Sequence, residues 1–153
     1  MSPHSYSRIW LHLTWATLRR QPVLRRPAGA KLSAHLHEYA SEKGIYMKVN
    51  YVNPEHVHAV IDLPTSLCVE EVMHLLKGES AYWVNQENLT VGKFAWGRGY
   101  GAFSVSESQV GRVASYVANQ EEHHRKLSFA EELRRLVERH GLRWHDDDEG
   151  GNC

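Results

Sequence analysis

The chain has 153 residues, of which 42% are hydrophobic and 24% are charged, a balance that is typical of one soluble globular domain and excludes disordered and fibrous proteins. Its eighteen Lys and Arg residues equal its eighteen Asp and Glu residues, so the chain as a whole lacks the positive excess of many nucleic-acid binders. No apolar run approaches the roughly 20 residues that cross a bilayer, and the two cysteines form no disulfide framework, so we expect a cytoplasmic protein without a membrane segment.

The N-terminal part of the chain predicts a strand, a helix and a hairpin. Residues 6–18 alternate between apolar and mixed side chains, which is the period of a strand. After two prolines, residues 28–44 carry apolar side chains at helical spacing and stop at a glycine, as many helices do. Residues 45–52 and 56–63 return to period two around the turn NPEH, which predicts a hairpin.

The remaining sequence predicts three further helices and one strand. A helix, a glycine-rich loop and a short strand cover, in chain order, residues 69–88, 92–101 and 102–106. A third helix begins near Ser106 or Ser108 and continues to about residue 126, and a last helix covers residues 129–140. In both of these helices, a serine followed three residues later by Gln or Glu has the spacing of a capping box.

The order strand, helix, strand, strand, helix, strand predicts an α+β fold of the ferredoxin-like split βαβ type (β-α-β-β-α-β), with an antiparallel sheet and appended C-terminal helices. We expect a single domain over residues 1–141. A mobile acidic tail, in which the run DDDE concentrates negative charge, follows over residues 142–153. This fold by itself implies no function.

Two histidines lie one residue apart in the second strand of the hairpin. Because side chains at i and i+2 of a strand point to the same face, His56 and His58 project together while Val57 and Ala59 face the core. Two imidazoles at this spacing can share one divalent cation, and they can also be two polar residues on a solvated face. A third ligand is needed to decide between these interpretations.

The third predicted helix offers such ligands. Tyr116 and Gln120 are four residues apart and lie above one another, and His124 continues this row with His123 beside it. The helix therefore presents a phenol, an amide and imidazoles on one face, and spacing alone excludes neither histidine as a metal ligand. In the alternative interpretation, the ring of Tyr116 packs in the core and its hydroxyl reaches water.

Several segments that contain these residues resemble one family of enzymes. The segments HVHAVIDLP, HLLKGESAYWVN, FAWGRGYGAFSVSES and VASYVANQEEHHRKLSFAEE, in that order, look like the single-tyrosine HUH transposases of small insertion sequences that move as single-stranded DNA. With LHLTWATLRRQPVL near the start, the resemblance covers about residues 11–132. The His-x-His pair alone is a weak signal, but its combination with YVANQEEHH at the right distance is highly specific.

The resemblance implies an activity and assigns a role to each site residue. His56 and His58 correspond to the metal-binding HUH pair. Tyr116 corresponds to the nucleophile and Gln120 to the third metal ligand. The implied cofactor is Mg²⁺ or Mn²⁺, with coordination positions left for water and phosphate oxygen. The implied enzyme is a transposase that cleaves and rejoins single-stranded DNA at hairpin-marked element ends through a 5′-phosphotyrosine.

Three cationic residues are candidates for DNA contacts. Arg19 and Arg20 follow the first predicted strand, and a guanidinium group matches the geometry of a phosphate. Lys77, in the segment LLKG, has two interpretations of equal weight: it contacts phosphate, or it is a solvated lysine on a helix.

Members of the resembled family are homodimers, and in several of them the tyrosine helix of one subunit completes the metal site of the other. The resemblance therefore implies a homodimer, with active sites either shared between subunits or contained in one. The alternative function is a non-catalytic or domesticated protein that binds single-stranded DNA hairpins. Metal binding and covalent adduct formation distinguish the two functions.

Overall fold

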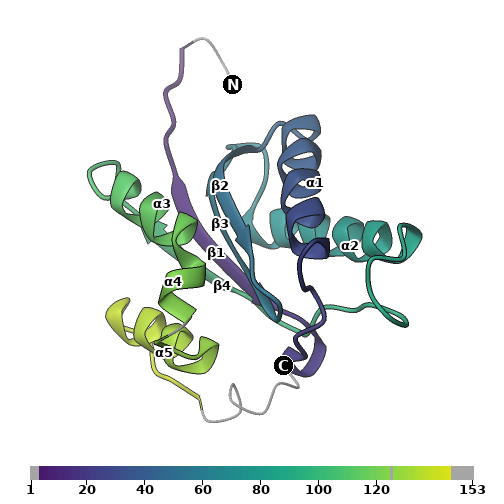
Figure 1. The fold of residues 1–153 in the computed structure, drawn as a ribbon. Coiled ribbons are helices and arrows are strands. Elements are labelled where there is room, and N and C mark those ends of the chain that lie inside the picture. Colours follow the sequence, from purple (N-terminus) through teal and green to yellow (C-terminus); the bar gives the residue numbers. More distant parts are fainter. Residues whose placement is uncertain (1–3, 125, 146–153) are drawn as a thin grey trace.

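The computed structural model describes residues 4–124 and 126–145, and at its centre lies a four-stranded antiparallel sheet (Figure 1). The strands, in chain order, are β1 (Trp10–Ala16), β2 (Tyr46–Val52), β3 (His56–Asp62) and β4 (Gly101–Val105). They lie in the order β2-β3-β1-β4, and each neighbouring pair is antiparallel. This is the strand arrangement of the ferredoxin-like split βαβ fold, so the predicted fold class is confirmed.

Helices cover both faces of the sheet (Figure 1). In chain order they are the short 3-10 helix η1 (Leu18–Arg20) and the α-helices α1 (Ala28–Glu42), α2 (Val69–Gln86), α3 (Val110–Ala118), α4 (Gln120–His124) and α5 (Phe129–Arg139). Helices α1 and α2 lie on one face, and α3, α4 and α5 lie on the other. Within the described part of the chain, no helix combines the length and the apolar character needed to cross a membrane.

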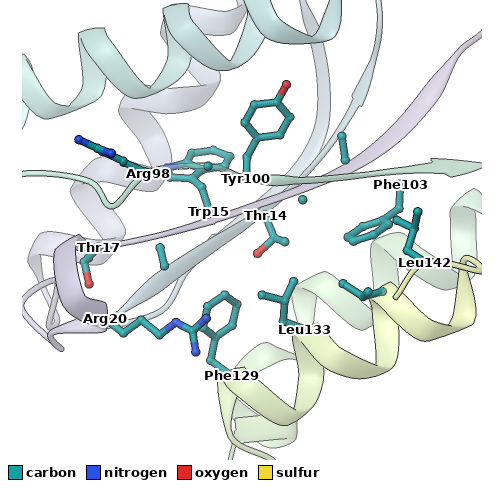
Figure 2. Close-up of a pocket in the computed structure, with 15 residues that line it drawn as sticks. Thr14, Trp15, Thr17, Arg20, Arg98, Tyr100, Phe103, Phe129, Leu133 and Leu142 are labelled. Atoms are coloured by element: carbon teal, nitrogen blue, oxygen red, sulfur yellow. The ribbon is translucent and has the colours of Figure 1, made fainter. Parts of the chain in front are cut away.

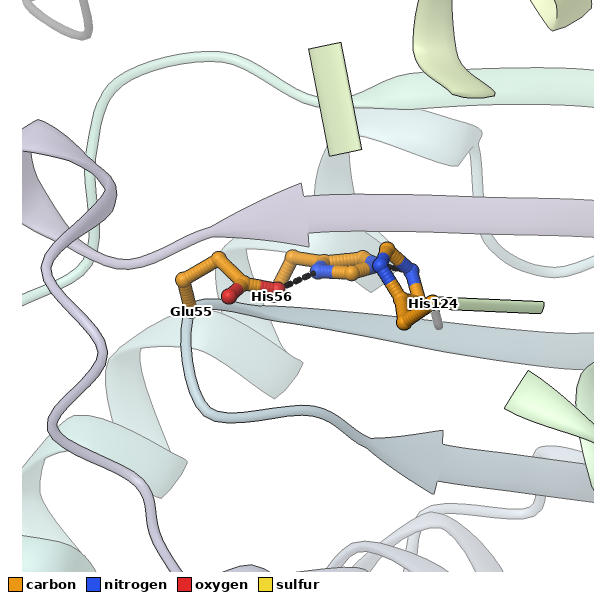
Figure 3. A group of neighbouring side chains, drawn as sticks. All are labelled: Glu55, His56 and His124. Atoms are coloured by element: carbon orange, nitrogen blue, oxygen red, sulfur yellow. Dashed lines mark hydrogen bonds and ion pairs between the residues drawn. The ribbon is translucent and has the colours of Figure 1, made fainter. Parts of the chain in front are cut away.

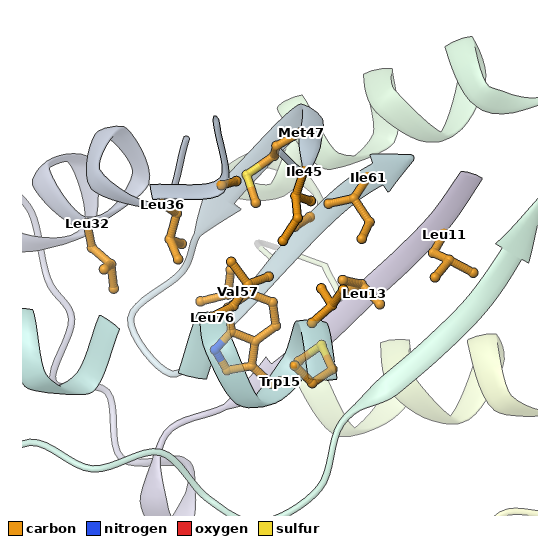
Figure 4. Packing of buried hydrophobic residues seen from close by; sticks show 14 of the residues in the cluster. Leu11, Leu13, Trp15, Leu32, Leu36, Ile45, Met47, Val57, Ile61 and Leu76 are labelled. Atoms are coloured by element: carbon orange, nitrogen blue, oxygen red, sulfur yellow. The ribbon is translucent and has the colours of Figure 1, made fainter. Parts of the chain in front are cut away.

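The main hydrophobic core lies between the sheet and helices α1 and α2 (Figure 4). Alternate residues of β1 and β3 point into it, and each is at most 7% exposed: Leu11, Leu13, Trp15, Val57, Ala59 and Ile61. Burial of one such large side chain stabilises the fold by about 1.5–3 kcal/mol. The same alternation sends His12 and Thr14 of β1, and both histidines of β3, to the face that α3 to α5 cover.

A tight turn joins β2 to β3 and places a histidine at the first position of β3. The amide of Asn53 donates to the carbonyl oxygen of His56 at 2.8 Å. On the other side of β3, His58 pairs with Thr14 of β1. The predicted hairpin is therefore confirmed, and its histidine strand lies in the interior of the sheet.

The first strand is shorter than the period-two pattern predicts. Pairing begins at Trp10, which lies opposite Asp62 of β3 and Val105 of β4. Residues 6–9 keep the alternating pattern, but β3 ends at Asp62, and Ile9 still bonds to that end of the sheet, where its carbonyl oxygen accepts from the amide of Leu63 at 2.8 Å. The pattern describes which side chains alternate, whereas the length of a strand depends on its neighbours.

The third predicted helix, continuous to about residue 126, is wrong in two respects. It begins only at Val110 without a side-chain cap, and the hydroxyl of Ser106 lies 3.1 Å from that of Ser108 instead. It also breaks at Asn119 (φ −102°, ψ 27°), whose side chain donates to the carbonyl oxygen of Ser115 at 2.9 Å. Because such local bonds from Asn compete with the helical ladder, we attribute the separation of α3 from α4 to this residue.

The last predicted helix is confirmed together with its cap. The hydroxyl of Ser128 accepts a hydrogen bond from the amide of Glu131 at 3.2 Å. Helix α5 ends at Arg139, and Gly141 follows it with a φ of +76°. Most of the predicted acidic tail, residues 146–153, lies outside the described residues. The single domain over residues 1–141 stays a prediction.

Candidate functional site

The two histidines of β3 are buried side by side. Both are 0% exposed, and their ring centroids are 5.0 Å apart. Their Nε2 atoms converge on one oxygen, Oε1 of Glu132 on α5, which lies 3.2 Å from His56 and 2.8 Å from His58. The interpretation of this pair as polar residues on a solvated face is therefore wrong.

Outer partners fix the orientation of each ring. The Nδ1 atom of His56 lies 2.5 Å from a carboxylate oxygen of Glu55, a contact that Figure 3 shows as a dashed line. The Nδ1 atom of His58 lies 2.7 Å from Nε2 of His12, which is buried on β1. Because Glu55 and His12 contact the two Nδ1 atoms, both Nε2 atoms point toward Glu132. Outer contacts of this kind orient histidines that bind metals.

Glu132 is the centre of the polar network. It is 2% exposed, and besides the histidines it accepts a hydrogen bond from the hydroxyl of Tyr116 and another from Nε2 of Gln120 at 3.0 Å. Burial alone would raise the pKa of Glu132, but hydrogen bonds from the surrounding histidines outweigh burial and hold the pKa far below its usual range. The carboxylate is therefore charged at neutral pH.

The histidines differ in their protonation. Burial, with repulsion from neighbouring histidines, lowers the pKa of His12 to about 3, and burial likewise lowers the pKa of His58 to about 4. Burial also acts to lower the pKa of His56, but Glu132 and Glu55 raise it above the ordinary value. His58 is thus neutral at pH 7. Because its Nε2 donates to the charged Glu132, its lone pair lies on Nδ1 and faces His12, so Nε2 has to release its proton before it can bind a metal.

Tyr116 reaches the site from α3 of the same chain. Its ring centroid lies 6.2 Å from that of His58, and its hydroxyl points to Glu132 rather than to water. The interpretation of Tyr116 as a rim aromatic with a solvated hydroxyl is therefore wrong. Burial, followed by the negative charge of Glu132, raises the pKa of Tyr116, so the phenol keeps its proton until another group takes it.

Gln120 also lies in the site, where Nδ2 of Asn53 contacts both its amide oxygen and, at 3.1 Å, Nε2 of His56. It is 0% exposed, and its Oε1 accepts a hydrogen bond from Nδ2 of Asn53 at 3.1 Å. His124 is closer to the pair, because its Nε2 lies 3.1 Å from Nε2 of His56 (Figure 3). The ring of His123 instead packs on Tyr116, with centroids 4.4 Å apart.

The donor atoms in this region fit a divalent cation. One nitrogen of His56, one of His58 and one carboxylate oxygen of Glu132 all lie within 4.8 Å of one another, and all three residues are buried. Glu55, His56 and His124 form a second group of this kind at the edge of the first. Two imidazole nitrogens with a carboxylate oxygen suit Mn²⁺ and Mg²⁺ better than two imidazoles with an amide.

The sequence predictions missed Glu132, although the chain carries a signal for it. Glu132 lies three residues after Phe129 and four before Leu136, and all three are buried on one face of α5. A charged residue in an apolar stripe is rarely buried without a partner. This irregularity marks Glu132 as part of a site, whereas Asn53 and Glu55 in the hairpin turn carry no comparable signal.

The three cationic candidates lie in different surroundings. The ammonium group of Lys77 donates to the carbonyl oxygens of Gly97 and Gly99 at 2.8 and 3.0 Å, and its partial burial lowers its pKa. It therefore ties down the glycine-rich loop, a role that neither sequence interpretation includes. Arg19 and Arg20 both have left-handed backbones, with φ of 56° and 53°, which cost L-residues about 1–2 kcal/mol each.

Arg20 lies close to the histidines, whereas Arg19 is exposed. The guanidinium carbon of Arg20 is 5.1 Å from the ring centroid of Phe129. The ring of Phe129 in turn stacks on His56, with centroids 4.0 Å apart. The strained turn after β1 thus places Arg20 against Phe129, and Phe129 is the ring that stacks on His56.

Comparisons with known proteins concern the same part of the chain. Residues 5–120 match the family described as "Transposase IS200 like". The ISDra2 transposase TnpA of Deinococcus radiodurans is 27% identical to this chain over 115 residues, which are 71% of this chain and 81% of that protein.

Two solved structures share the fold. A putative transposase from Deinococcus radiodurans R1 has a TM-score of 0.60 at 24% identity and covers 78% of this chain and 96% of its own. The REP-associated tyrosine transposase bound to a REP hairpin has a TM-score of 0.58 at 14% identity and covers 81% of this chain and 74% of its own. The family match ends before α5, the helix that carries Glu132.

Proposed function

Because the chain belongs to the IS200-like transposase family, we propose that it is a metal-dependent transposase that cleaves and rejoins single-stranded DNA at hairpin-marked element ends through a 5′-phosphotyrosine. One observation carries the chemical part of this proposal: the hydroxyl of Tyr116 and the Nε2 atoms of His56 and His58 all contact the carboxylate of Glu132 within one chain. The relative that was solved with a REP hairpin supports hairpin recognition.

We propose that His56 and His58 hold Mg²⁺ or Mn²⁺ through their Nε2 atoms. Glu132, Gln120 and His124 are the candidates for the third ligand. The carboxylate is the best placed, because it lies near both His56 and His58, whereas the oxygen of Gln120 accepts from Asn53. When bound, the cation neutralises a non-bridging phosphate oxygen and orients the scissile bond for in-line attack.

Tyr116 is the proposed nucleophile. Its phenolic oxygen attacks the phosphorus and forms a new P–O bond, while the bond from phosphorus to the 3′ oxygen breaks and leaves a free 3′-hydroxyl. Oε2 of Glu132 accepts the hydrogen bond from that hydroxyl and orients it, but a carboxylate whose pKa lies far below its usual range is too weak a base to keep the phenolic proton. The step balances when this proton ends on the departing 3′ oxygen, which becomes the free hydroxyl. Because the phosphotyrosine conserves the bond energy, a second 3′-hydroxyl can displace the tyrosine and rejoin the strands without ATP.

We also propose phosphate contacts for the cationic candidates. Arg19 and Arg20 would bind the DNA backbone beside the site, because their turn brings one of them close to His56. Lys77 has three N–H donors and uses two of them on loop carbonyls, so one remains for a phosphate near the glycine-rich loop.

Incubation with labelled DNA tests the proposal. The probe is an imperfect palindrome from the DNA that flanks the gene, with unpaired nucleotides on both sides. With Mg²⁺, the wild-type protein should form a covalent adduct that survives denaturation, and Tyr116→Phe should form none while it still binds the probe. Hairpin binding without metal binding or adduct formation would instead support the non-catalytic or domesticated hairpin-binding protein.

A further inference from the structure

A cavity of about 430 Å³ lies beside the candidate metal site, between β1, β4 and α5 (Figure 2). On the face of the sheet that α5 covers, the cavity is lined by Thr14 of β1, Phe103 of β4, and Phe129 and Leu133 of α5. Arg20 lies at one end. Phe129 separates the cavity from the site, because the same ring stacks on His56 at 4.0 Å. A group in this cavity would therefore lie one aromatic ring away from the proposed metal ligands.

Two residues that line the cavity carry a buried polar atom without a partner among the described residues: Thr14, and Trp15, whose ring belongs to the main hydrophobic core. Thr14 is 1% exposed, and its hydroxyl makes no hydrogen bond with any described residue. Figure 2 shows this oxygen directed toward the space in front of Leu133. Thr14 pairs with His58 in the sheet, so its position is fixed by the same strands that fix the site. Because an unpaired buried hydroxyl destabilises a protein, a ligand that bonds to it would be favoured.

The absence of a side chain at one glycine permits the close packing of two residues in the cavity wall. Gly101 of β4 pairs with Thr14 across the sheet. A Cβ atom at Gly101 would lie 2.9 Å from Cγ2 of Thr14 and 2.8 Å from Cε2 of Phe103. Such distances are too short for carbon atoms, so a side chain here would force Thr14 or Phe103 to shift.

We propose that this cavity holds one unpaired nucleobase, from a nucleotide next to the scissile phosphate, and the proposal rests on the proposed function. A base is a flat ring with apolar faces and a polar edge, which matches aromatic and aliphatic walls with one hydroxyl. The volume lies in the range of small-ligand pockets. The guanidinium of Arg20 provides a counter-charge for the phosphate of that nucleotide.

Fluorescent bases test the proposal without cleavage. Each unpaired position on both sides of the scissile phosphate is replaced in turn by 2-aminopurine, in the palindromic probe described above, and bound to the Tyr116→Phe protein. We expect a marked change in emission at one flanking position only, which also shows whether the base lies 5′ or 3′ of the cut. The same change should be absent in a protein that also carries Leu133→Trp, because the indole fills the cavity.

Affinities provide a second measurement. Removal of the base at that position, to give an abasic site, should weaken binding to the Tyr116→Phe protein about tenfold, as expected for a base that stacks on a protein. With Leu133→Trp added, the intact and the abasic probe should bind equally. Valine has nearly the same shape as threonine, so Thr14→Val should reduce the affinity for the intact probe about fivefold and leave the affinity for the abasic probe unchanged. Melting temperatures of the variants show whether each one folds.

The opposite results would overturn the proposal. If no flanking base responds, or if the abasic probe loses as much affinity with Leu133→Trp as without it, the cavity does not hold a base. These results are independent of the proposed function, which is tested by the adduct that the wild-type protein forms. A protein that forms the adduct but shows no base in the cavity would retain its function and lose only this inference.

Discussion

Glu132 shows how one carboxylate can organise a buried polar site. It contacts His56, His58, a phenol and an amide, and it comes from a helix that the family match does not include. Hydrogen bonds to charged groups contribute about 1.5–3 kcal/mol each, and a partner left without its bond costs a similar amount. The side chains of the site therefore depend on one another, and the effect of a single substitution shows which contacts matter.

Glu132→Gln keeps the shape of the side chain and removes its charge. If Glu132 is the third ligand, Mn²⁺ should bind at least about tenfold more weakly, because a charge-assisted contact of this size is lost. Titration calorimetry with the metal alone measures this without DNA. Glu131→Gln, at the exposed neighbouring position, is the matched control and should bind Mn²⁺ as the wild type does. Unchanged affinity in Glu132→Gln would exclude Glu132 and leave Gln120 or His124 as the third ligand.

Glu55→Gln tests the outer contact of His56. The substitution weakens the bond that fixes the ring through Nδ1. Loss of such an outer partner lowers metal affinity about 10- to 100-fold, so Mn²⁺ should bind more weakly than in the wild type and more strongly than in His56→Ala. Equal affinities of Glu55→Gln and the wild type would show that the turn alone orients the ring.

At the scale of elements, the two faces of the sheet and the extent of α1, α2 and α5 could be predicted from the sequence, whereas the break between α3 and α4 could not. Period two in residues 56–62 determines which face carries the histidines, because a strand allows no other arrangement. The row from Tyr116 to Gln120 assumed a straight helix, and Asn119 breaks it. Glu132 joins the site only because α5 packs back on the sheet, a long-range contact that no local pattern contains.

Two serines with the same predicted role provide a test of α5. Ser128 caps α5 through the amide of Glu131, whereas Ser106 caps no helix. Ser128→Ala should therefore lower the free energy of unfolding by about 1 kcal/mol, and Ser106→Ala should change it little. Chemical denaturation measures both values. Equal losses in the two variants would contradict the assignment of the cap.

At the scale of the whole molecule, one chain contains every group that the proposed chemistry uses. Helix α3 carries the phenol, β3 carries the imidazoles, and α5 carries the carboxylate that joins them. The break at Asn119 lies between Tyr116 and Gln120, so it provides a point at which α3 could change its direction relative to α4. A homodimer with exchanged tyrosine helices and a homodimer with two separate sites are therefore both compatible with the proposed reaction, but they differ in which chain supplies Tyr116.

A mixture of two inactive proteins distinguishes these arrangements. Tyr116→Phe lacks the nucleophile, and His56→Ala lacks one imidazole, so neither should form an adduct alone. Because Tyr116 contacts Glu132 of its own chain, we expect the mixture to remain inactive even after the two proteins are unfolded and refolded together. Wild-type chains treated in the same way are the control for recovery. Adduct formation by the mixture, with the label on the His56→Ala chain, would show instead that a tyrosine from one subunit serves the histidines of the other.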